Sequence, residues 1–314
     1  MKKPLVVIAG ATACGKTDIA IDLALKINGE IISADSMQVY KYMNIGTAKA
    51  SKESMKGVPH FLIDVLYPDE DFSVALFKDM AKSCIDDIHS RGKMPILVGG
   101  TGFYINALIY DTNFTNTDVN EKDTAYRESL YALAEDKKLL YNMLKEVDPE
   151  ATLYIHENNV KKVVRALEYY KETGKKISQH NQEEQKREEA YKTHFFILNR
   201  DRKILYENIE KRVDNMAQKG LVEEVKNILD LGYKEDLVSM NGIGYKEIIS
   251  YLKGESSLDE SIDLLKRNTR RFAKRQITWF KNKSDGVWID IDESTTTEKT
   301  INSIAEAIKI GEYK

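Results

Sequence analysis

An α/β fold, with a parallel sheet core interrupted by an all-helical insertion, is predicted by three observations. Short β-branched apolar runs recur along the chain and suit strands that are buried on both faces. Helical patterns alternate with these runs, as expected for a parallel sheet with helical crossovers. The alternation stops after Tyr110, where only helical patterns follow for about eighty residues. The chain of 314 residues, 42% of them hydrophobic, can bury a core of this kind.

Six apolar runs are expected to form the strands of the sheet. They are residues 5–9, 30–33, 61–66, 95–98, 195–198 and 287–291. Between the first two runs, Ile19, Leu23 and Ile27 share one stripe of a helix. A second amphipathic helix begins near Phe77 and is stopped by Gly92.

The same patterns divide the chain into three segments. We expect a first part of the catalytic core over residues 1–112, a helical insertion over 113–193 and a second part of the core over 194–314. Leu130 and Leu133 look like core positions of short helices in the insertion. A further helix there spans residues 158–173 and ends at Gly174.

A phosphate-binding loop follows the first expected strand. Its G-x-x-x-x-G-K-[ST] motif is Gly10-Ala11-Thr12-Ala13-Cys14-Gly15-Lys16-Thr17. The glycines let backbone N–H groups approach phosphate oxygens, and the next helix directs its positive end toward them. Lys16 adds a point charge, and the Thr17 hydroxyl can ligate Mg²⁺. The motif predicts a P-loop NTPase-like core, but kinases, NTPases and pyrophosphate-releasing transferases all use it.

Two further polar groups follow strands of the predicted sheet. Asp35 and Ser36 come after the second strand, and Thr101 follows the glycines after the fourth. Residues at the carboxyl ends of parallel strands face the ligand crevice, so these side chains should lie near the phosphates. The structural alternatives are an Asx-type turn at Asp35 and a plain glycine-rich turn before Thr101.

A basic helix is predicted near the C-terminal end of the core. Residues 266–281 contain no acid, although the chain has a net charge of −3. Helical spacing places five cations largely on one side: Arg267, Arg270, Arg271, Lys274 and Arg275. Such a stripe is typical of a surface that binds a nucleic-acid backbone. The alternative is a solvated face whose cations pair with acids from elsewhere.

The cysteines and the apolar stretches indicate the cellular compartment in which the protein is expected. Cys14 and Cys84 lie far apart, which gives no disulfide framework or paired metal motif. We therefore expect a reducing, cytoplasmic setting. No stretch approaches the roughly 20 apolar residues of a membrane span, and we expect a monomer that does not bind membranes.

At the level of whole motifs, the chain resembles the tRNA dimethylallyltransferase family from about residue 4 to 281. The motifs that carry this resemblance occur in order: GATACGKT, ADSMQVYKYMNIGTAK, VPHFLID, ILVGGTGFYINAL, VVRALE, GIGYKE and RRFAKRQITWF. One small departure is Ala11, where the family often has proline. Together these motifs are far more specific than the phosphate-binding loop alone.

The resemblance implies a chemistry. The family transfers a dimethylallyl group from dimethylallyl pyrophosphate to the exocyclic amine of the adenosine just 3′ of the tRNA anticodon. The loop would hold pyrophosphate, with Lys16 and Mg²⁺ at Thr17 stabilising the leaving group. Asp35 matches the family's general base, and Arg212 looks like a family arginine on the pyrophosphate side.

The same resemblance implies a set of tRNA contacts. They are Asp35, Ser36, Met37, Gln38, Thr101, Arg127, Lys161, Lys162, Arg165, Asn241, Gly242, Ile243, Gly244, Tyr245 and Lys246. The cations of the basic helix, among them Arg267, Arg270, Arg271 and Lys274, would bind the stem backbone at a place away from Asp35. The insertion would hold the far side of the anticodon arm.

Three other functions use part of the same features. A small-molecule kinase would use ATP on the loop but would leave the basic helix without a role. A transferase acting on free adenine nucleotides would also have no use for the insertion. A non-catalytic RNA-binding module would explain the positive charge but not Lys16, Thr17 and Asp35 together.

Overall fold

A computed structural model describes residues 2–112, 121–185, 187–292 and 297–312. They form two compact units, a core of Met1–Asp111 with Ala190–Lys314 and an insertion of Thr112–Glu189. Residues 190–193, which the sequence analysis gave to the insertion, belong to the core because a core strand begins at Lys192. The predicted start of the insertion at residue 113 lies outside the described residues.

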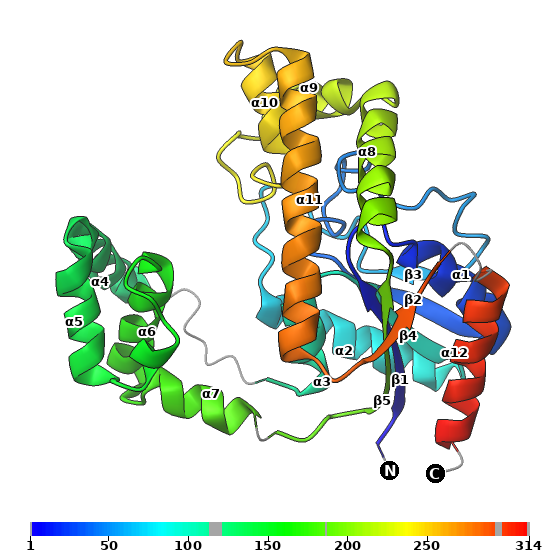
Figure 1. The fold of residues 1–314 in the computed structure, drawn as a ribbon, viewed down its shortest axis with the longest axis horizontal. Helices are drawn as coiled ribbons and strands as arrows, with labels where there is room; N and C mark the ends of the chain where they lie inside the picture. Colours follow the sequence, from blue (N-terminus) through cyan, green and yellow to red (C-terminus); the bar gives the residue numbers. More distant parts are fainter. Residues whose placement is uncertain (1, 113–120, 186, 293–296, 313–314) are drawn as a thin grey trace. The chain divides into compact units, whose positions relative to one another are not determined.

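The core is built on a parallel sheet, as the sequence predicts. In the described residues the sheet has six strands in the order β3-β2-β4-β1-β5-β6, and every neighbouring pair is parallel (Figure 1). The strands are β1 (Pro4–Gly10), β2 (Gly29–Ala34), β3 (His60–Phe61), β4 (Met94–Gly99), β5 (Lys192–Asn199) and β6 (Val287–Asp290). Strands β1, β2 and β4 are buried along almost their whole length, which explains their continuous apolar runs.

The edge strand β3 is much shorter than the predicted run 61–66. Leu62 and Asp64 adopt left-handed backbone conformations, with φ of 60° and 56°. Such conformations interrupt the extended backbone that a strand needs. Beyond Phe61, the rest of this run makes an isolated parallel bridge between Leu66 and Tyr40.

Helices cover both faces of the sheet. One face packs against α1, α8 and α12, which contribute Ile19, Ile209 and Ile304 to a buried cluster. The other face packs against α2 and α3. These helices are α1 (Lys16–Ile27), α2 (Val74–Ser90), α3 (Gly102–Ile109), α8 (Arg202–Gln218) and α12 (Thr297–Glu312).

The long helix α11 (Leu258–Lys283) belongs to both faces, because Ala273 is buried in the first cluster and Phe280 in the second. In Figure 1 it runs beside α8 for much of its length, and ion pairs join the two helices. Its start is fixed by a capping box between Ser257 and Glu260.

A third cluster lies among helices α8, α9 (Leu221–Asp230), α10 (Tyr245–Leu252) and α11. It buries Val213, Val225, Ile248 and Leu265 together with Val39, Tyr40 and Met43 from the segment after β2. The first part of the irregular chain that follows Asp35 therefore packs on a layer of helices.

The insertion has its own core. Its helices are α4 (Glu121–Ala132), α5 (Lys137–Val147), α6 (Val160–Thr173) and α7 (Ile177–Gln185), with short 3₁₀ turns at Leu133–Glu135 and Ala151–Leu153. Leu130 is buried as predicted, but Leu133 is 37% exposed because it lies in a 3₁₀ turn. Gly174 ends α6 in a left-handed conformation, as its position predicts.

Candidate active site

A pocket of about 180 Å³ lies where β1, β2 and β4 end. It collects side chains from the phosphate-binding loop, the segment after β2, α8 and α11. Those with polar or aromatic groups that bear on the chemistry are Thr12, Lys16, Thr17, Asp18, Ser33, Asp35, Gln38, His60, Arg212, Phe272 and Gln276. The structure thus brings the predicted loop, Asp35, Gln38 and Arg212 into one cavity.

The phosphate-binding loop has the backbone that its glycines predict. Gly15 has a φ of 94° at the N-cap of α1, a conformation that favours glycine. The Cys14 N–H donates to the Ala11 carbonyl at 3.4 Å, and the Lys16 ammonium donates to the same carbonyl at 3.3 Å. Cys14 itself is buried, with 1% of its surface exposed, so its thiol packs inside the loop.

Residues distant in sequence brace this loop. Arg200, directly after β5, donates from Nε to the Cys14 carbonyl at 2.8 Å. From α8, Asn208 donates to the Ala13 carbonyl at 3.4 Å, and a guanidinium nitrogen of Arg212 donates to the Thr12 hydroxyl at 3.3 Å. The loop carbonyls are thereby occupied by side chains from the second part of the core.

Gln276 on α11 contacts the loop across 264 positions of sequence. Its Oε1 accepts from the Thr12 N–H at 2.8 Å, and its Nε2 donates to the Gly100 carbonyl at 3.0 Å. A Cβ at Gly100 would come 2.2 Å from that Nε2, so glycine makes room for the link. The glycine-rich turn after β4 therefore receives α11, and Thr101 caps α3 and does not line the pocket.

Two half-buried cations, Lys16 and Arg212, dominate the electrostatics of the pocket. Burial lowers the pKa of Lys16, and the neighbouring Arg212 lowers it further. The pKa of Arg212 is also lowered, chiefly by burial. The nearby Asp35 carboxylate opposes both pKa shifts. Because desolvation disfavours both cations, an anion bound between them would be strongly attracted.

Asp35 is held at the pocket by a turn. Its Oδ1 accepts from the N–H groups of Met37 and Gln38, at 2.9 and 3.3 Å. Within the described residues, no protein group donates to its Oδ2. The Asx turn and the pocket position, alternatives in the sequence analysis, are both present, because the turn uses one oxygen and leaves the other to a ligand.

The two segments predicted to contact tRNA near the pocket adjoin each other. Met37 lies against the turn at Gly242, where an added Cβ would come 2.6 Å from the Met37 Cε. Tyr245 in that turn is 0% exposed and donates its hydroxyl to Glu224 at 2.7 Å. Its side chain cannot touch RNA in this structure, so its predicted contact is wrong for the side chain.

The remaining members of these segments differ in exposure. Ser36 is half-buried, Ile243 packs partly into the third cluster, and Gly244 is buried. Asn241 and Lys246 are exposed, although the Asn241 amide donates to backbone carbonyls of its own turn.

Some cations of the basic helix form ion pairs within the protein, and others are exposed. Lys266 pairs with Asp214 at 2.6 Å, and Arg270 pairs with Glu210 at 2.8 Å, both acids on α8. The exposed cations are Arg267, Arg271, Lys274 and Arg275. None of these cations lines the pocket with Asp35, although Phe272 and Gln276 of the same helix do.

The candidate RNA contacts of the insertion lie on α4 and α6. Arg127 is exposed, yet its guanidinium pairs with the buried Glu168 at 2.5 Å and so joins the two helices. Lys161 and Lys162 are exposed at the start of α6, and Arg165 is half-buried one turn later.

Oxygen ligands for a metal are available, but not as a closed cage. The described residues hold no group of three or more His, Cys, Asp and Glu side chains suited to a metal ion. The pocket presents the Thr17 hydroxyl with the carboxylates of Asp18 and Asp35. This donor set fits Mg²⁺, which usually takes one or two protein oxygens and completes its shell with phosphates and water. In the same residues, no helix is long and apolar enough to cross a bilayer.

Sequence reasoning missed the residues that brace the loop. Arg200 could have been found, because it follows a strand paired with β1 and strand ends meet at one edge. Gln276 could have been found only from a weak pattern. It is a neutral side chain in a basic helix, three residues after Ala273, and this spacing places it on the buried stripe.

The parallel sheet has an interior strand, β1, that runs into a braced glycine-rich loop beside a pocket with two half-buried cations and a carboxylate. This architecture defines the class of proteins with a P-loop NTPase-like fold. The model of the IPP transferase family matches residues 38–283. The chain belongs to this family, the tRNA dimethylallyltransferases, which confirms the resemblance of its motifs.

Similar proteins support this membership. A tRNA dimethylallyltransferase of Lachnoclostridium phytofermentans is 55% identical over 289 residues, which cover 91% of each chain. A solved tRNA isopentenylpyrophosphate transferase of Bacillus halodurans has a TM-score of 0.74 and 43% identity, over 100% of this chain and 99% of that one. A eukaryotic dimethylallyltransferase solved acting on tRNA has a TM-score of 0.84 and 31% identity, over 98% and 80% of the chains.

Proposed function

We propose that this chain transfers a dimethylallyl group from dimethylallyl pyrophosphate to the exocyclic amine of the adenosine 3′ of the anticodon in tRNA, releasing pyrophosphate. The observation that carries the proposal is that a phosphate loop, two half-buried cations and Asp35 meet in one pocket. The names of its relatives as dimethylallyltransferases support the donor and the tRNA acceptor.

The phosphate loop would receive the pyrophosphate. Loop N–H groups, the N-terminus of α1 and the ammonium of Lys16 would bind its oxygens. Arg212, already within 3.3 Å of the Thr12 hydroxyl, would add a second cation to the leaving group. Negative charge grows on the pyrophosphate as the allylic C–O bond breaks, and cations already in place stabilise that charge without reorganisation.

Asp35 would remove the proton. The adenosine amine forms a C–N bond to the allylic carbon while the C–O bond to pyrophosphate breaks. The amine proton passes to the Asp35 carboxylate, whose Oδ2 is available in the described residues. Because an aromatic amine is a poor nucleophile, alignment of nitrogen with carbon and a placed base are the expected solution.

Mg²⁺ would be held by the Thr17 hydroxyl together with the pyrophosphate, with Asp18 and Asp35 as nearby carboxylates. When bound, it would neutralise part of the charge on the leaving group.

The tRNA would reach the pocket past the segment after β2. The target base must leave the anticodon-loop stack, at a cost of a few kcal/mol, to reach Asp35. Exposed cations on α11, among them Arg267, Arg271 and Lys274, would offset this cost through backbone contacts. Lys161 and Lys162 on the insertion would supply further contacts.

A labelling experiment tests the proposal against its competitors. The protein is incubated with Mg²⁺, dimethylallyl pyrophosphate labelled in the allyl group, and either tRNA, AMP, or ATP with small acceptors. Label in tRNA, located to the nucleotide 3′ of the anticodon, is the expected result. Label in AMP alone would identify a transferase of free nucleotides, and phosphate transfer from ATP would identify a kinase.

A further inference from the structure

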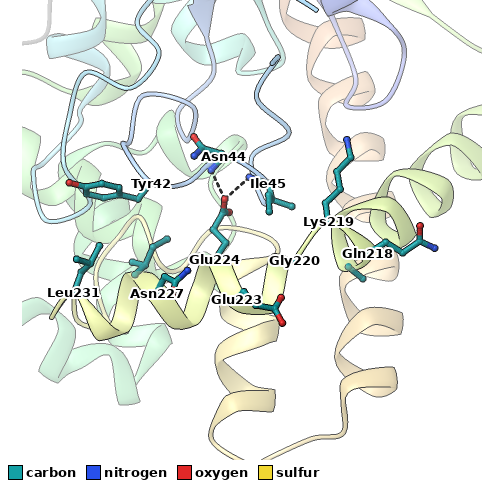
Figure 2. A pocket seen from close by; sticks show the side chains of 12 residues that line it. Tyr42, Asn44, Ile45, Gln218, Lys219, Gly220, Glu223, Glu224, Asn227 and Leu231 are labelled. Atoms are coloured by element: carbon teal, nitrogen blue, oxygen red, sulfur yellow. Dashed lines mark hydrogen bonds between the residues drawn. The ribbon is translucent and has the colours of Figure 1, made fainter. Parts of the chain in front are cut away.

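A second carboxylate outside the pocket holds the segment that follows Asp35. Glu224 lies on α9 and points toward the backbone at Asn44 and Ile45 (Figure 2). Its Oε2 accepts from the N–H groups of Asn44 and Ile45 at 2.9 and 2.7 Å. Its Oε1 accepts from the Gly46 N–H at 3.0 Å and from the Tyr245 hydroxyl at 2.7 Å. Four donors thus converge on one side chain.

The anchored segment forms a wall of the candidate active site. Thr47 and Ala48, directly after the three anchored N–H groups, line the pocket with Asp35. The Thr47 carbonyl accepts from the Gln38 Nε2 at 3.2 Å, and the Gln38 N–H donates to Asp35. Glu224 is therefore connected to Asp35 through hydrogen bonds to Gly46, from Gln38 to Thr47 and from Gln38 to Asp35, joined by the chain itself.

Regular structure does not fix this wall. Between β2, which ends at Ala34, and β3, which begins at His60, the described chain contains no helix or further strand. The position of Thr47 and Ala48 therefore depends on anchors supplied by other elements. Lys49 provides one, because its ammonium pairs with Asp64 at 2.5 Å and donates to the Tyr40 carbonyl.

The anchor also involves a close backbone approach. A Cβ at Gly46 would come 2.6 Å from the ring of Tyr245, so only glycine lets the segment lie on that ring. Tyr245 is fully buried, and Glu224 together with burial raises its pKa well above the usual value. The hydroxyl therefore stays protonated and donates to Glu224.

Carboxylate chemistry suits this place better than an amide. Both oxygens of Glu224 accept N–H bonds, whereas the amide of glutamine has one accepting oxygen and one NH₂ group. In either orientation, a glutamine would turn its NH₂ toward at least one backbone N–H. The N–H groups of Ile45 and Gly46 are partly buried, and a donor that faces another donor there loses its hydrogen bond and part of its hydration.

We infer that Glu224 is a positioning residue for transfer: it holds residues 44–46 so that the pocket wall at Thr47 and Ala48, and through Gln38 the Asp35 carboxylate, keep the geometry of the reaction. This inference rests on the proposed function. Glu224 also borders a separate pocket of about 710 Å³ between the Tyr42 segment and α9. That pocket lies apart from the phosphate loop and shares none of its residues.

The test compares two neighbouring substitutions. Glu223 is next to Glu224 on α9 and points away from the anchored segment (Figure 2), so Glu223→Gln makes the same charge change without breaking the anchor. The assays are single-turnover transfer at saturating tRNA, tRNA affinity, thermal melting, and limited trypsin digestion of the segment that carries Lys41, Lys52 and Lys56.

Glu224→Gln is expected to lower the single-turnover rate by roughly 10- to 100-fold, the range that a misplacement of about 1 Å can produce. Affinity for tRNA should stay within about threefold, and trypsin should cleave the segment faster. Glu223→Gln should change none of these readouts. Tyr245→Phe, which keeps the ring and removes one bond to Glu224, should lower the rate about fivefold.

The outcomes separate the two proposals. If wild type and Glu223→Gln both label tRNA while Glu224→Gln and Tyr245→Phe keep the wild-type rate, the positioning role is wrong and the proposed function stands. Equal losses in the Glu223 and Glu224 variants would also overturn it. If no form labels tRNA, the proposed function fails. Trypsin digestion then tests the anchor by itself. Equal cleavage of Glu223→Gln and Glu224→Gln would show that Glu224 does not hold the segment.

Discussion

Replacing Asp35 by asparagine separates its basicity from its structural work. The Asp35 Oδ1 accepts from Met37 and Gln38 at 2.9 and 3.3 Å, and an asparagine oxygen can accept the same two bonds. The turn should therefore survive, while the group that takes the proton is lost. A placed general base contributes about 10²- to 10⁴-fold, which corresponds to about 2.7–5.5 kcal/mol of transition-state stabilisation.

Single-turnover transfer at saturating tRNA is the appropriate assay, because it reports the chemical step without product release. The rate should fall by that factor, while tRNA affinity and the melting temperature stay close to wild type. Asp35→Ala serves as the control, since it also removes the acceptor for both N–H groups and should add a loss of stability of about 1–3 kcal/mol. An Asp35→Asn rate within threefold of wild type would refute the role of Asp35 as base.

Three more predictions concern the frame around the site. Gln276→Leu should weaken pyrophosphate-substrate binding and lower the free energy of unfolding in urea by about 2–4 kcal/mol, because the Thr12 N–H and Gly100 carbonyl lose their partner. An unchanged affinity and an unchanged free energy of unfolding would show that Gln276 does not support the loop. Replacing the exposed Arg267, Arg271 and Lys274 by Gln should weaken tRNA binding and flatten its salt slope by about 2, whereas an equal slope in a folded variant would show a merely solvated face. Glu30 is fully buried, and hydrogen bonds from Arg91 and Lys93 lower its pKa. The stability that the ionised Glu30 contributes is therefore fully present above its unfolded pKa of about 4.3, and it is lost as the pH falls through the lower folded pKa. Glu30→Gln should therefore lower stability at pH 7 by about 2 kcal/mol and flatten its fall in acid; an unchanged acid profile in urea titrations would contradict this.

The fold was largely readable because a strand buried on both faces has a strong signature. Residues 5–9 and 95–98 are such runs, and they are the central pair of the sheet. The run 61–66 has the same composition, but left-handed residues confine the strand to two positions. The N–H groups of Asp64 and Val65 bond to the carbonyls of Gln38 and Val39, partners that local patterns do not encode.

The candidate site was readable in part, for a related reason. Lys16 and Asp35 each follow a strand, so the rule that strand ends share one edge places both at the crevice. Gln276 reaches Thr12 across 264 positions of sequence, and Glu224 reaches the Asn44 segment across about 180. Such contacts depend on how helices pack on the core, and no spacing within one segment reports them.

The way the chain leaves the core and returns to it makes the insertion separable. The Ala190 N–H donates to the Ile109 carbonyl at 2.7 Å, so the two ends of the excursion are tied together within the core. Because these ends already lie side by side, a short glycine-rich bridge could replace residues 112–189 with little closure entropy. The excised core would retain the sheet, the phosphate loop and Asp35. It would offer a reagent in which donor binding is measured without the helical insertion, and onto which an RNA-binding module could be grafted to redirect the proposed chemistry.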